Sequence, residues 1–252
     1  MTTPVRDEPP ALPEELVLGP RAHRTLPRWV PLAALFLGIA LLAGAAAWRF
    51  WPRPTEPLSL AELQNTYAGM VRSDGTNDAS VMTRQTVGET PLTVTPTACA
   101  ALVQTTVGNR FPDAARDGVG TYWLGSGSAI SLFTLRFDDA GAAQDERTRI
   151  ATALDDCTDE QIFVRRTDGD SAQAWSATVA RTAVGDAGDE QLGYVLTGNG
   201  GVMAIQLMPY LNTVTWQYRY ESGRSSYSTL AAEQLMQGLR AQLDAVVAAR
   251  PR

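Results

Sequence analysis

The sequence predicts an α+β fold, an antiparallel β-sheet with helices packed on one face, preceded by a single transmembrane helix. Three observations lead to this prediction. Residues 29–48 (WVPLAALFLGIALLAGAAAW) carry no charge, segments of the second half alternate apolar and polar residues, and amphipathic helices flank those segments. Strands in a run with helices around them are typical of an antiparallel sheet covered by helices.

The apolar run has the length of a membrane span. Its twenty residues form a helix of about 30 Å at about 1.5 Å per residue, which matches the bilayer interior, and Trp29 and Trp48 suit the two interfaces. Arg21, Arg24 and Arg28 precede it, against Arg49 and Arg53 after it, which favours a cytoplasmic N-terminus. The alternatives are a buried soluble helix and a cleaved signal peptide, because Ala45 and Ala47 form an A-x-A pattern.

The span divides the chain into four parts. Residues 1–28 are rich in Pro and lack periodicity, so we expect a disordered cytoplasmic tail. Residues 29–48 are the transmembrane helix, residues 49–57 a stiff Pro-rich spacer, and residues 58–250 an extracytoplasmic domain. The predicted location is the plasma membrane, crossed once.

Helical signals come first in the domain. Ser59 and Glu62 form a capping box before an apolar stripe, and a short helix is expected over Thr97–Val107. Ser128–Phe137 is predicted as a strand, followed by a helix that Asp138 or Asp139 caps and that ends at Leu154. Further strands are predicted at 162–166, 173–180, 192–197, 202–208 and 214–220, with a hairpin loop at 198–201. A final amphipathic helix is predicted from Ser228, and its apolar stripe consists of Leu235, Leu239, Leu243 and Val246.

The last strand separates two kinds of side chain. Val214, Trp216, Tyr218 and Tyr220 share one face, whereas Thr213, Thr215, Gln217 and Arg219 share the other, so we expect one buried and one wet face. Trp216 and Tyr218 are predicted to lie in the core, although they could instead line a recognition groove with Tyr122 and Trp123. Tyr220, Arg224 and Tyr227 are the predicted ligand or partner contacts, because aromatic residues and Arg anchor interfaces.

The chain has two cysteines, Cys99 and Cys157, and both follow the span. One disulfide in an oxidising compartment is the expected state, and two free buried thiols are the alternative. No Cys lies near the end of the apolar run, which argues against a lipidated N-terminal cysteine.

The composition excludes several kinds of chemistry. The basic residues other than one His are all Arg, a pattern typical of a high-GC, actinobacterial chain. After residue 53 there are 15 Arg against 23 Asp plus Glu, which gives a formal charge of −8. This negative charge disfavours nucleic acid as a partner. His23 precedes the span, so the domain has no His for a catalytic triad or a zinc site, and without Lys there is no Walker-type phosphate loop.

We therefore expect no catalytic residue, no metal and no cofactor. The acidic residues that could bind calcium lack the spacing of a calcium loop and are predicted to be solvated helix ends or turns: Asp155, Asp156, Asp159 and Glu160; Asp168 and Asp170; Asp186, Asp189 and Glu190.

The order of these elements resembles the extracellular sensor domain of mycobacterial PknH-type receptor kinases, over roughly residues 58–250. The resemblance rests on Leu58–Glu62 (LSLAE), on Cys99 after Pro96, on Phe137–Cys157 with its Ala-rich helix, on Val184–Asp186 (VGD), and on the closing amphipathic helix. The family commonly has a second disulfide, for which this chain has no Cys, and no kinase precedes the span. The resemblance implies an extracytoplasmic recognition domain without its own output enzyme.

These observations predict a membrane-anchored binding or sensor-like domain without catalytic activity, whose ligand or protein partner the sequence does not identify. One alternative is a cell-envelope hydrolase that uses carboxylates. Another is a structural subunit of a membrane complex, because Ala34 with Gly38 and Ala40 with Gly44 offer small-residue faces for helix packing within the membrane.

Overall fold

The computed structural model describes residues 56–70, 79–167, 173–182, 191–224 and 230–250. The chain divides into two compact units at Pro54 and Thr55, and all the described residues belong to the second. The predicted tail and transmembrane helix, and most of the spacer, lie outside the described residues. Among the helices that are described, none has the length and apolar character needed to cross a bilayer.

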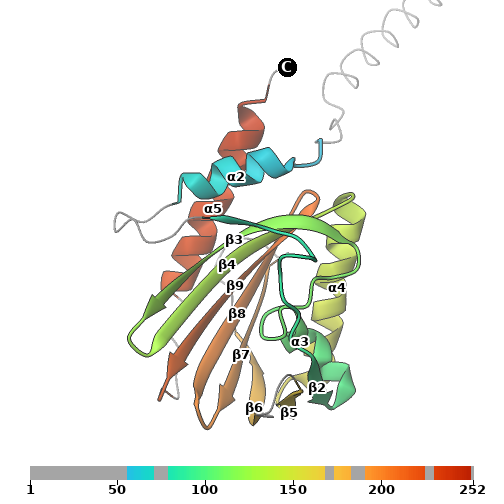
Figure 1. The fold of residues 1–252 in the computed structure, drawn as a ribbon, viewed down its shortest axis with the longest axis vertical. Helices are drawn as coiled ribbons and strands as arrows, with labels where there is room; N and C mark the ends of the chain where they lie inside the picture. Colours follow the sequence, from blue (N-terminus) through green and yellow to red (C-terminus); the bar gives the residue numbers. More distant parts are fainter. Residues whose placement is uncertain (1–55, 71–78, 168–172, 183–190, 225–229, 251–252) are drawn as a thin grey trace, which may run out of the picture. The chain divides into compact units, whose positions relative to one another are not determined.

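The described strands form one antiparallel sheet of nine strands (Figure 1). Its strand order is β1-β3-β4-β9-β8-β7-β6-β5-β2, so that the short strands β1 and β2 lie at the two edges. The strands are β1 (Ser80–Met82), β2 (Leu92–Thr95), β3 (Ala115–Gly125), β4 (Ser128–Phe137), β5 (Gln161–Arg166), β6 (Ala174–Arg181), β7 (Leu192–Gly198), β8 (Gly201–Tyr210) and β9 (Thr213–Ser222).

The predicted strands over 128–220 are confirmed as β4 to β9, whereas β1, β2 and β3 were not predicted. The two edge strands have three and four residues, too few to show a period. Strand β3 contains Gly118 and Gly120, which weaken a strand pattern. Packing requires glycine at 118, because a Cβ there would lie 2.4 Å from the Thr134 carbonyl oxygen. A Cβ at Gly120 would lie 2.6 Å from the Met82 sulfur, so the Met82 side chain would have to move.

The helices begin largely where their caps predict. In α2 (Leu60–Ala68) the Ser59 hydroxyl accepts a hydrogen bond from the Glu62 amide, and the Glu62 carboxylate accepts one from the Ser59 amide. In α4 (Ala140–Cys157) Asp139 is the cap and accepts a hydrogen bond from the Ala142 amide at 2.8 Å. The predicted helix at 97–107 is the 3₁₀ turn η1 (Thr97–Cys99) followed by α3 (Ala100–Gln104), and the last helix is α5 (Leu230–Ala248).

One face of the sheet packs against α3 and α4 and forms the larger apolar core. On α4 the buried apolar side chains include Ala143, Ile150, Ala153 and Leu154, and they share this core with strand residues that include Phe133, Leu135, Leu207 and Trp216. Trp216 is fully buried and stacks on Phe133, with 5.6 Å between the ring centroids. This confirms the core assignment of Trp216, and Tyr218 is half-buried against the same cluster.

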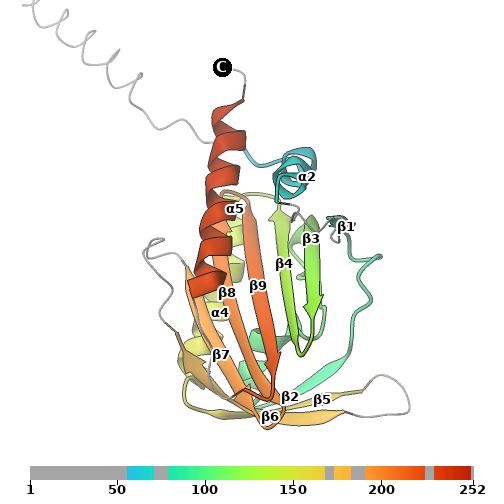
Figure 2. The same ribbon diagram turned by 90° about the vertical axis from the view of Figure 1, so that its left-hand side faces the viewer.

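The opposite face is covered as well, by α2 and α5 (Figure 2), so the prediction of helices on one face only is wrong. Here Leu63, Tyr67, Leu239 and Leu243 pack against strand residues such as Leu132 and Met208. These strand residues alternate with the ones that face α4, because successive side chains of a strand point to opposite faces. Where α5 covers the sheet, the sheet is therefore enclosed between two helical layers, α3 with α4 on one face and α2 with α5 on the other.

The face of β9 that the sequence predicts to be wet is consequently buried. Thr213, Thr215 and Gln217 are at most 3% exposed. The polar atoms of this layer are partly paired with one another, since the Thr134 hydroxyl lies 2.8 Å from both the Tyr67 hydroxyl and the Thr215 hydroxyl. Burial also raises the pKa of Tyr67 above its ordinary value, so this phenol stays protonated in the folded protein.

Cys99 and Cys157 form a disulfide, which confirms the predicted bridge. The two sulfurs are 2.08 Å apart and the Cα atoms 5.8 Å apart. The bond joins the turn η1 to the last residue of α4, and both cysteines are buried within the larger core. It therefore ties the α3–α4 layer together beneath the sheet.

A charged contact joins the two ends of the domain. Arg250 donates hydrogen bonds to both carboxylate oxygens of Glu62, at 2.7 and 3.1 Å, and others to the carbonyl oxygens of Glu56 and Pro57. The hydrogen bond from Arg250 lowers the pKa of Glu62 from its ordinary value to about 2. The residues that lead into α2 are thus fixed to Arg250, two residues beyond the end of α5.

We expect this contact to make the stability of the domain depend on pH. The pKa of Glu62 is lowered on folding, so its contribution is complete above the unfolded value of about 4.5 and is lost as the pH falls from there to about 2. Because the carboxylate is partly exposed, we expect Glu62→Gln to reduce the free energy of unfolding at pH 7 by about 2 kcal/mol. Urea unfolding at pH 7, 4 and 3 measures this, and a variant that loses as much stability on acidification as the wild type would contradict it. The matched control is Glu89→Gln, an exposed carboxylate 3.9 Å from its partner Arg110.

Candidate ligand groove

A groove opens beside the hairpin between β7 and β8, at the lower end of the sheet in Figure 1. It has a volume of about 670 Å³, within the range of small-molecule sites. Its lining comes from β5 to β9 and from the residue Val107 beyond α3: Val107, Phe163, Ala174, Trp175, Ser176, Ala177, Leu196, Gly198, Asn199, Gly200, Gly201, Met203 and Tyr220.

The hairpin that forms one wall depends on glycine. Gly201 has a φ of +147°, and a Cβ there would lie 2.2 Å from the Glu221 carbonyl oxygen. At Gly198 a Cβ would lie 2.5 Å from the Ser176 carbonyl oxygen. The Tyr220 hydroxyl then donates a hydrogen bond to the Gly200 carbonyl oxygen at 2.8 Å. The glycines thus allow the close approach of β6 and β9, and Tyr220 fixes the tip of the hairpin.

None of the residues that line the groove is ionisable near neutral pH. Trp175 and Met203 are half-buried at its wall, and Phe163 is 49% exposed beside them. The polar groups of the lining are hydroxyls, the Asn199 amide and main-chain groups of the hairpin. An apolar wall with a few neutral polar groups is suited to a neutral, largely apolar molecule.

Of the three predicted contact residues, one lies at the groove. Tyr220 lines it. Arg224 does not: its side chain is 72% exposed and its Nε lies 3.4 Å from the Glu221 carboxylate. Tyr227 lies outside the described residues. The other aromatic residues considered for a groove are separated by the sheet, since Trp123 is buried in the α2–α5 layer while its neighbour Tyr122 is 65% exposed.

Trp175, Leu196 and Met203 line the groove but were not predicted as site residues, because each belongs to a different strand. The glycines at 198–201 indicate a hairpin, so the sequence predicts that β7 and β8 are neighbours. That prediction accounts for only one wall of the groove. The position of Trp175 opposite them depends on the pairing of β6 with β7, which the local pattern does not determine.

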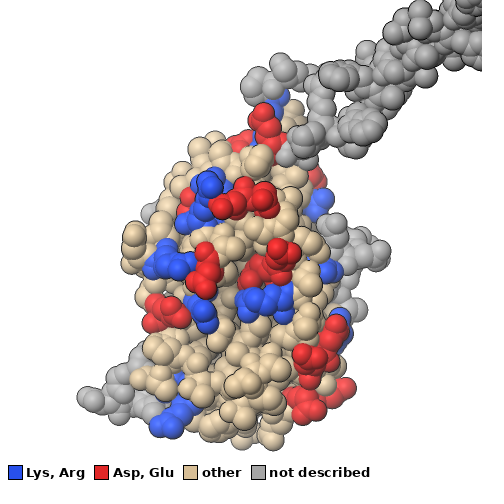
Figure 3. All heavy atoms as spheres, turned by 90° about the vertical axis from the view of Figure 1, so that its right-hand side faces the viewer, with Lys and Arg blue, Asp and Glu red and all other residues tan. Residues whose placement is uncertain are grey.

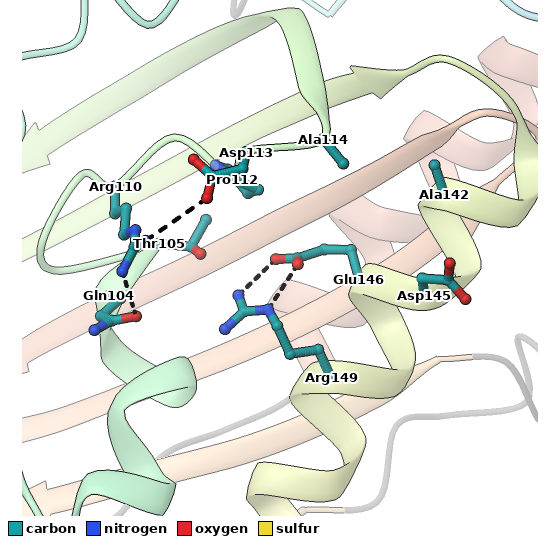
Figure 4. A pocket seen from close by; sticks show the side chains of 10 residues that line it. All are labelled: Gln104, Thr105, Arg110, Pro112, Asp113, Ala114, Ala142, Asp145, Glu146 and Arg149. Atoms are coloured by element: carbon teal, nitrogen blue, oxygen red, sulfur yellow. Dashed lines mark hydrogen bonds and ion pairs between the residues drawn. The ribbon is translucent and has the colours of Figure 1, made fainter.

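A second pocket, of about 340 Å³, lies between α4 and the segment after α3 (Figure 4). Unlike the groove it has charged walls, with Glu146 and Arg149 from α4 facing Arg110 and Asp113. Arg149 donates two hydrogen bonds of 2.8 Å to the Glu146 carboxylate, which is only 7% exposed. This pairing raises the pKa of Arg149. Both oxygens of Glu146 are thus engaged in an ion pair within the protein.

Acidic and basic residues lie next to one another on this side of the molecule, and the lower part of the face is mostly uncharged (Figure 3). Ion pairs of the domain include Arg116 with Asp138 and Arg136 with Asp117. Asp155 pairs with Arg181, and the remaining acidic clusters at 168–170 and 186–190 lie outside the described residues. Within the described part of the chain, no three metal-ligating side chains come together.

Comparison with known proteins gives a structural match but no sequence match. No family model matches the chain, and no curated protein sequence does. Among solved structures, the extracellular domain of PknH from Mycobacterium tuberculosis is similar, with a TM-score of 0.53 and 14% identity over 76% of this chain and 98% of that domain. An uncharacterized protein from Mycobacterium smegmatis gives a TM-score of 0.41 and 12% identity over 75% and 98%.

The likeness covers nearly all of the PknH extracellular domain and about three quarters of this chain. The sequence identity of 14% is far too low for an activity or a ligand to be carried over from PknH. The match therefore concerns the fold alone. The resemblance predicted from the sequence is thereby confirmed at that level: the domain has the fold of a PknH-type extracellular sensor domain.

Proposed function

We propose that this protein is a single-pass membrane protein whose C-terminal domain lies outside the cytoplasm and binds a ligand without transforming it. The charge-free run at 29–48 and the disulfide support the location. The fold supports the role, because the similar solved structure is the extracellular domain of PknH. A domain of this kind passes on information through a partner or through the membrane segment.

The observation that carries the proposal is the uncharged groove at the β7–β8 hairpin. Its volume and apolar lining are suited to a neutral, largely apolar ligand, with Trp175 and Met203 on the wall and Tyr220 near the hairpin. Burying apolar surface there contributes about 25 cal/mol per Å² of the area removed from water. A ligand that covers the Trp175 ring would therefore gain a large part of its affinity from that side chain.

The fluorescent probe N-phenyl-1-naphthylamine, which is neutral and apolar, tests the groove. The unit Thr55–Arg252 is suitable for this titration, because it contains every described core residue and its own disulfide. We expect saturable binding that Trp175→Ala weakens roughly tenfold, as the loss of an aromatic anchor does. Tyr122→Ala, which removes an exposed aromatic residue away from the groove, is the matched control. Absence of saturable binding, or equal weakening by both substitutions, would refute this site.

Protease treatment of intact cells tests the location. With an epitope tag at the C-terminus, we expect added trypsin to remove the tag while a cytoplasmic marker protein stays intact, because the domain offers exposed Arg residues such as Arg84 and Arg224. If the tag is lost only after the cells are permeabilised, the C-terminal domain is cytoplasmic and the proposed topology is wrong.

A further inference from the structure

Two smaller hollows lie beside the groove, on the face of the sheet that α3 and α4 partly cover. The first, which we call the neck, has a volume of about 60 Å³ and lies over β4 and β9, with Tyr218 in its lining. The second, the edge pocket, has a volume of about 320 Å³ and lies where β1, β3 and β4 meet, with Gly120 and Ser131 in its lining. Both belong to the same face as the groove, because Met203 of the groove, Tyr218 of the neck and Phe133 of both hollows pack in the α3–α4 core.

The neck opens into the edge pocket. Four residues line both of them: Met82, Val87, Ser131 and Phe133. Met82 and Val87 are half-buried, so part of their apolar surface remains free at this junction. Gly120 carries no side chain, so β3 leaves room for the edge pocket here.

The neck also adjoins the groove. Strand β9 lines both, because Tyr220 lies at the groove and Tyr218 at the neck, and residues two apart in a strand point to the same face about 7 Å from each other. The segment after α3 forms a wall of both, with Val107 at the groove and Phe111 at the neck. Groove, neck and edge pocket therefore form one trough that crosses the sheet from β6 to β3.

The trough is almost uncharged. Among the described residues that line it, Arg110 at the neck is the only charged one. Its guanidinium lies 3.9 Å from the carboxylates of both Asp113 and Glu89, so its charge is partly compensated. The side-chain polar groups of the edge pocket are hydroxyls, such as those of Ser80 and Ser131. An uncharged occupant is therefore favoured, because a charge placed here would lose its hydration without gaining a partner.

The neck limits the shape of an occupant. Its volume of about 60 Å³ is less than a tenth of the 670 Å³ of the groove. A sugar ring, a fused ring system or a peptide with side chains is too wide for such a passage. An unbranched alkyl chain is slim enough to pass, and its flexibility allows it to follow the curved face of the sheet.

The strand order sets the length of an occupant. From β6 through β7, β8, β9 and β4 to β3 the trough spans about 24 Å, at about 4.8 Å for each step between strands. The groove alone, from β6 to β9, spans about 14 Å by the same measure. An extended alkyl chain advances by about 1.3 Å per carbon, because its bonds are about 1.5 Å long. The whole trough thus fits a chain of about 18 carbons and the groove alone a chain of about 11.

We propose that the groove, the neck and the edge pocket together bind one long, unbranched alkyl chain of an uncharged amphiphile. The inference rests on the proposed function, because the chain reaches the neck through the same groove, and it names the class of ligand that the groove receives. The chain covers the half-buried side chains of Trp175, Met203, Tyr218 and Met82 in turn, and thereby removes apolar surface from water along its whole length. The uncharged head group remains at the hairpin, where the Asn199 amide and main-chain groups lie.

Displacement of N-phenyl-1-naphthylamine from the unit Thr55–Arg252 by octaethylene glycol monoalkyl ethers, kept below their critical micelle concentrations, tests the proposal. The decyl, dodecyl, tetradecyl and hexadecyl ethers share one neutral head group and differ only in chain length. We expect the Kd of the wild type to fall about fourfold for each added methylene up to the hexadecyl ether, which corresponds to the ~0.8 kcal/mol gained by burying a methylene.

Ser131→Trp places a large side chain where the neck meets the edge pocket. We expect the decyl ether to bind this variant as it binds the wild type, because the groove is unchanged, and the gain in affinity to stop near the dodecyl ether. The hexadecyl ether should then bind the variant more than about 100-fold more weakly than the wild type, since the gain from four methylenes is lost. Thr148→Trp, on the exposed surface of α4, is the matched control and should keep the full gain.

The outcomes separate this proposal from the proposed function. If the decyl ether does not displace the probe from the wild type, the groove is not an apolar site and both proposals are wrong. If the decyl ether binds but the gain in the wild type stops near the dodecyl ether, the site ends at β9 and only the continuous trough is refuted. Equal binding of the hexadecyl ether to the wild type and to Ser131→Trp would likewise show that the chain does not pass through the neck.

Discussion

Loss of the Cys99–Cys157 bond is expected to reduce the free energy of unfolding by about 4 kcal/mol. The cysteines are 58 residues apart in sequence, and a cross-link that closes a loop of this length restricts the unfolded chain by that amount in the chain-entropy model. The total stability of a domain is about 5–15 kcal/mol, so the bond accounts for a large part of it. Urea unfolding of the wild type with and without a reductant measures this difference.

The reduced wild type is the appropriate comparison, because both thiols remain in the core. The double variant Cys99→Ala/Cys157→Ala also removes two buried sulfur atoms, and we expect it to lose about 1–2 kcal/mol more than reduction does. If reduction costs less than about 1 kcal/mol, the bond does not constrain the unfolded chain as the loop length implies. In that case the packing of α3 on α4 holds this layer together without the cross-link.

Except for β3, the sequence predicts the long elements of this fold well, because each shows its own period. Helix α4 and strands β4, β8 and β9 have 10 or more residues, and their caps or alternation are visible locally. What the sequence does not show is which layer covers which face. Thr213 to Gln217 alternate as a half-wet strand does, yet helices from opposite ends of the chain, α2 and α5, enclose that face of the sheet. Only the long-range packing decides whether a polar face meets water.

The same limit applies to the candidate sites. Tyr220 was predicted as a contact residue from its type and place near the end of β9, and it does line the groove. Trp175 and Met203 reach the groove through the pairing of β6 with β7 and of β7 with β8. A contact between residues that are close in sequence can be predicted from composition and spacing. A site assembled from several strands requires the register, which the chain sets by its tertiary packing.

Substitution of Asn212 is expected to have a similarly large effect, although the residue is polar and lies in the turn between β8 and β9. Its side chain is 2% exposed. The Oδ1 accepts a hydrogen bond of 2.6 Å from the Leu58 amide, and the Nδ2 donates to the carbonyl oxygens of Leu58, at 3.3 Å, and of Phe137, at 3.0 Å. One carboxamide thus joins Leu58, which precedes α2, to the end of β4 and to the β8–β9 turn.

We expect Asn212→Leu to reduce the free energy of unfolding by about 4 kcal/mol, because it removes three hydrogen bonds and leaves buried main-chain groups without this partner. Asn65→Ala is the control, since Asn65 is exposed on α2, and it should change stability by less than about 0.5 kcal/mol. Urea unfolding measures both. Because the Asn212 side chain joins Leu58 to the sheet, amide exchange at Leu58 should also rise in Asn212→Leu, ahead of exchange in the α4 layer. Equal acceleration throughout the domain would mean that Asn212 supports global stability and does not specifically fix the segment that leads into α2.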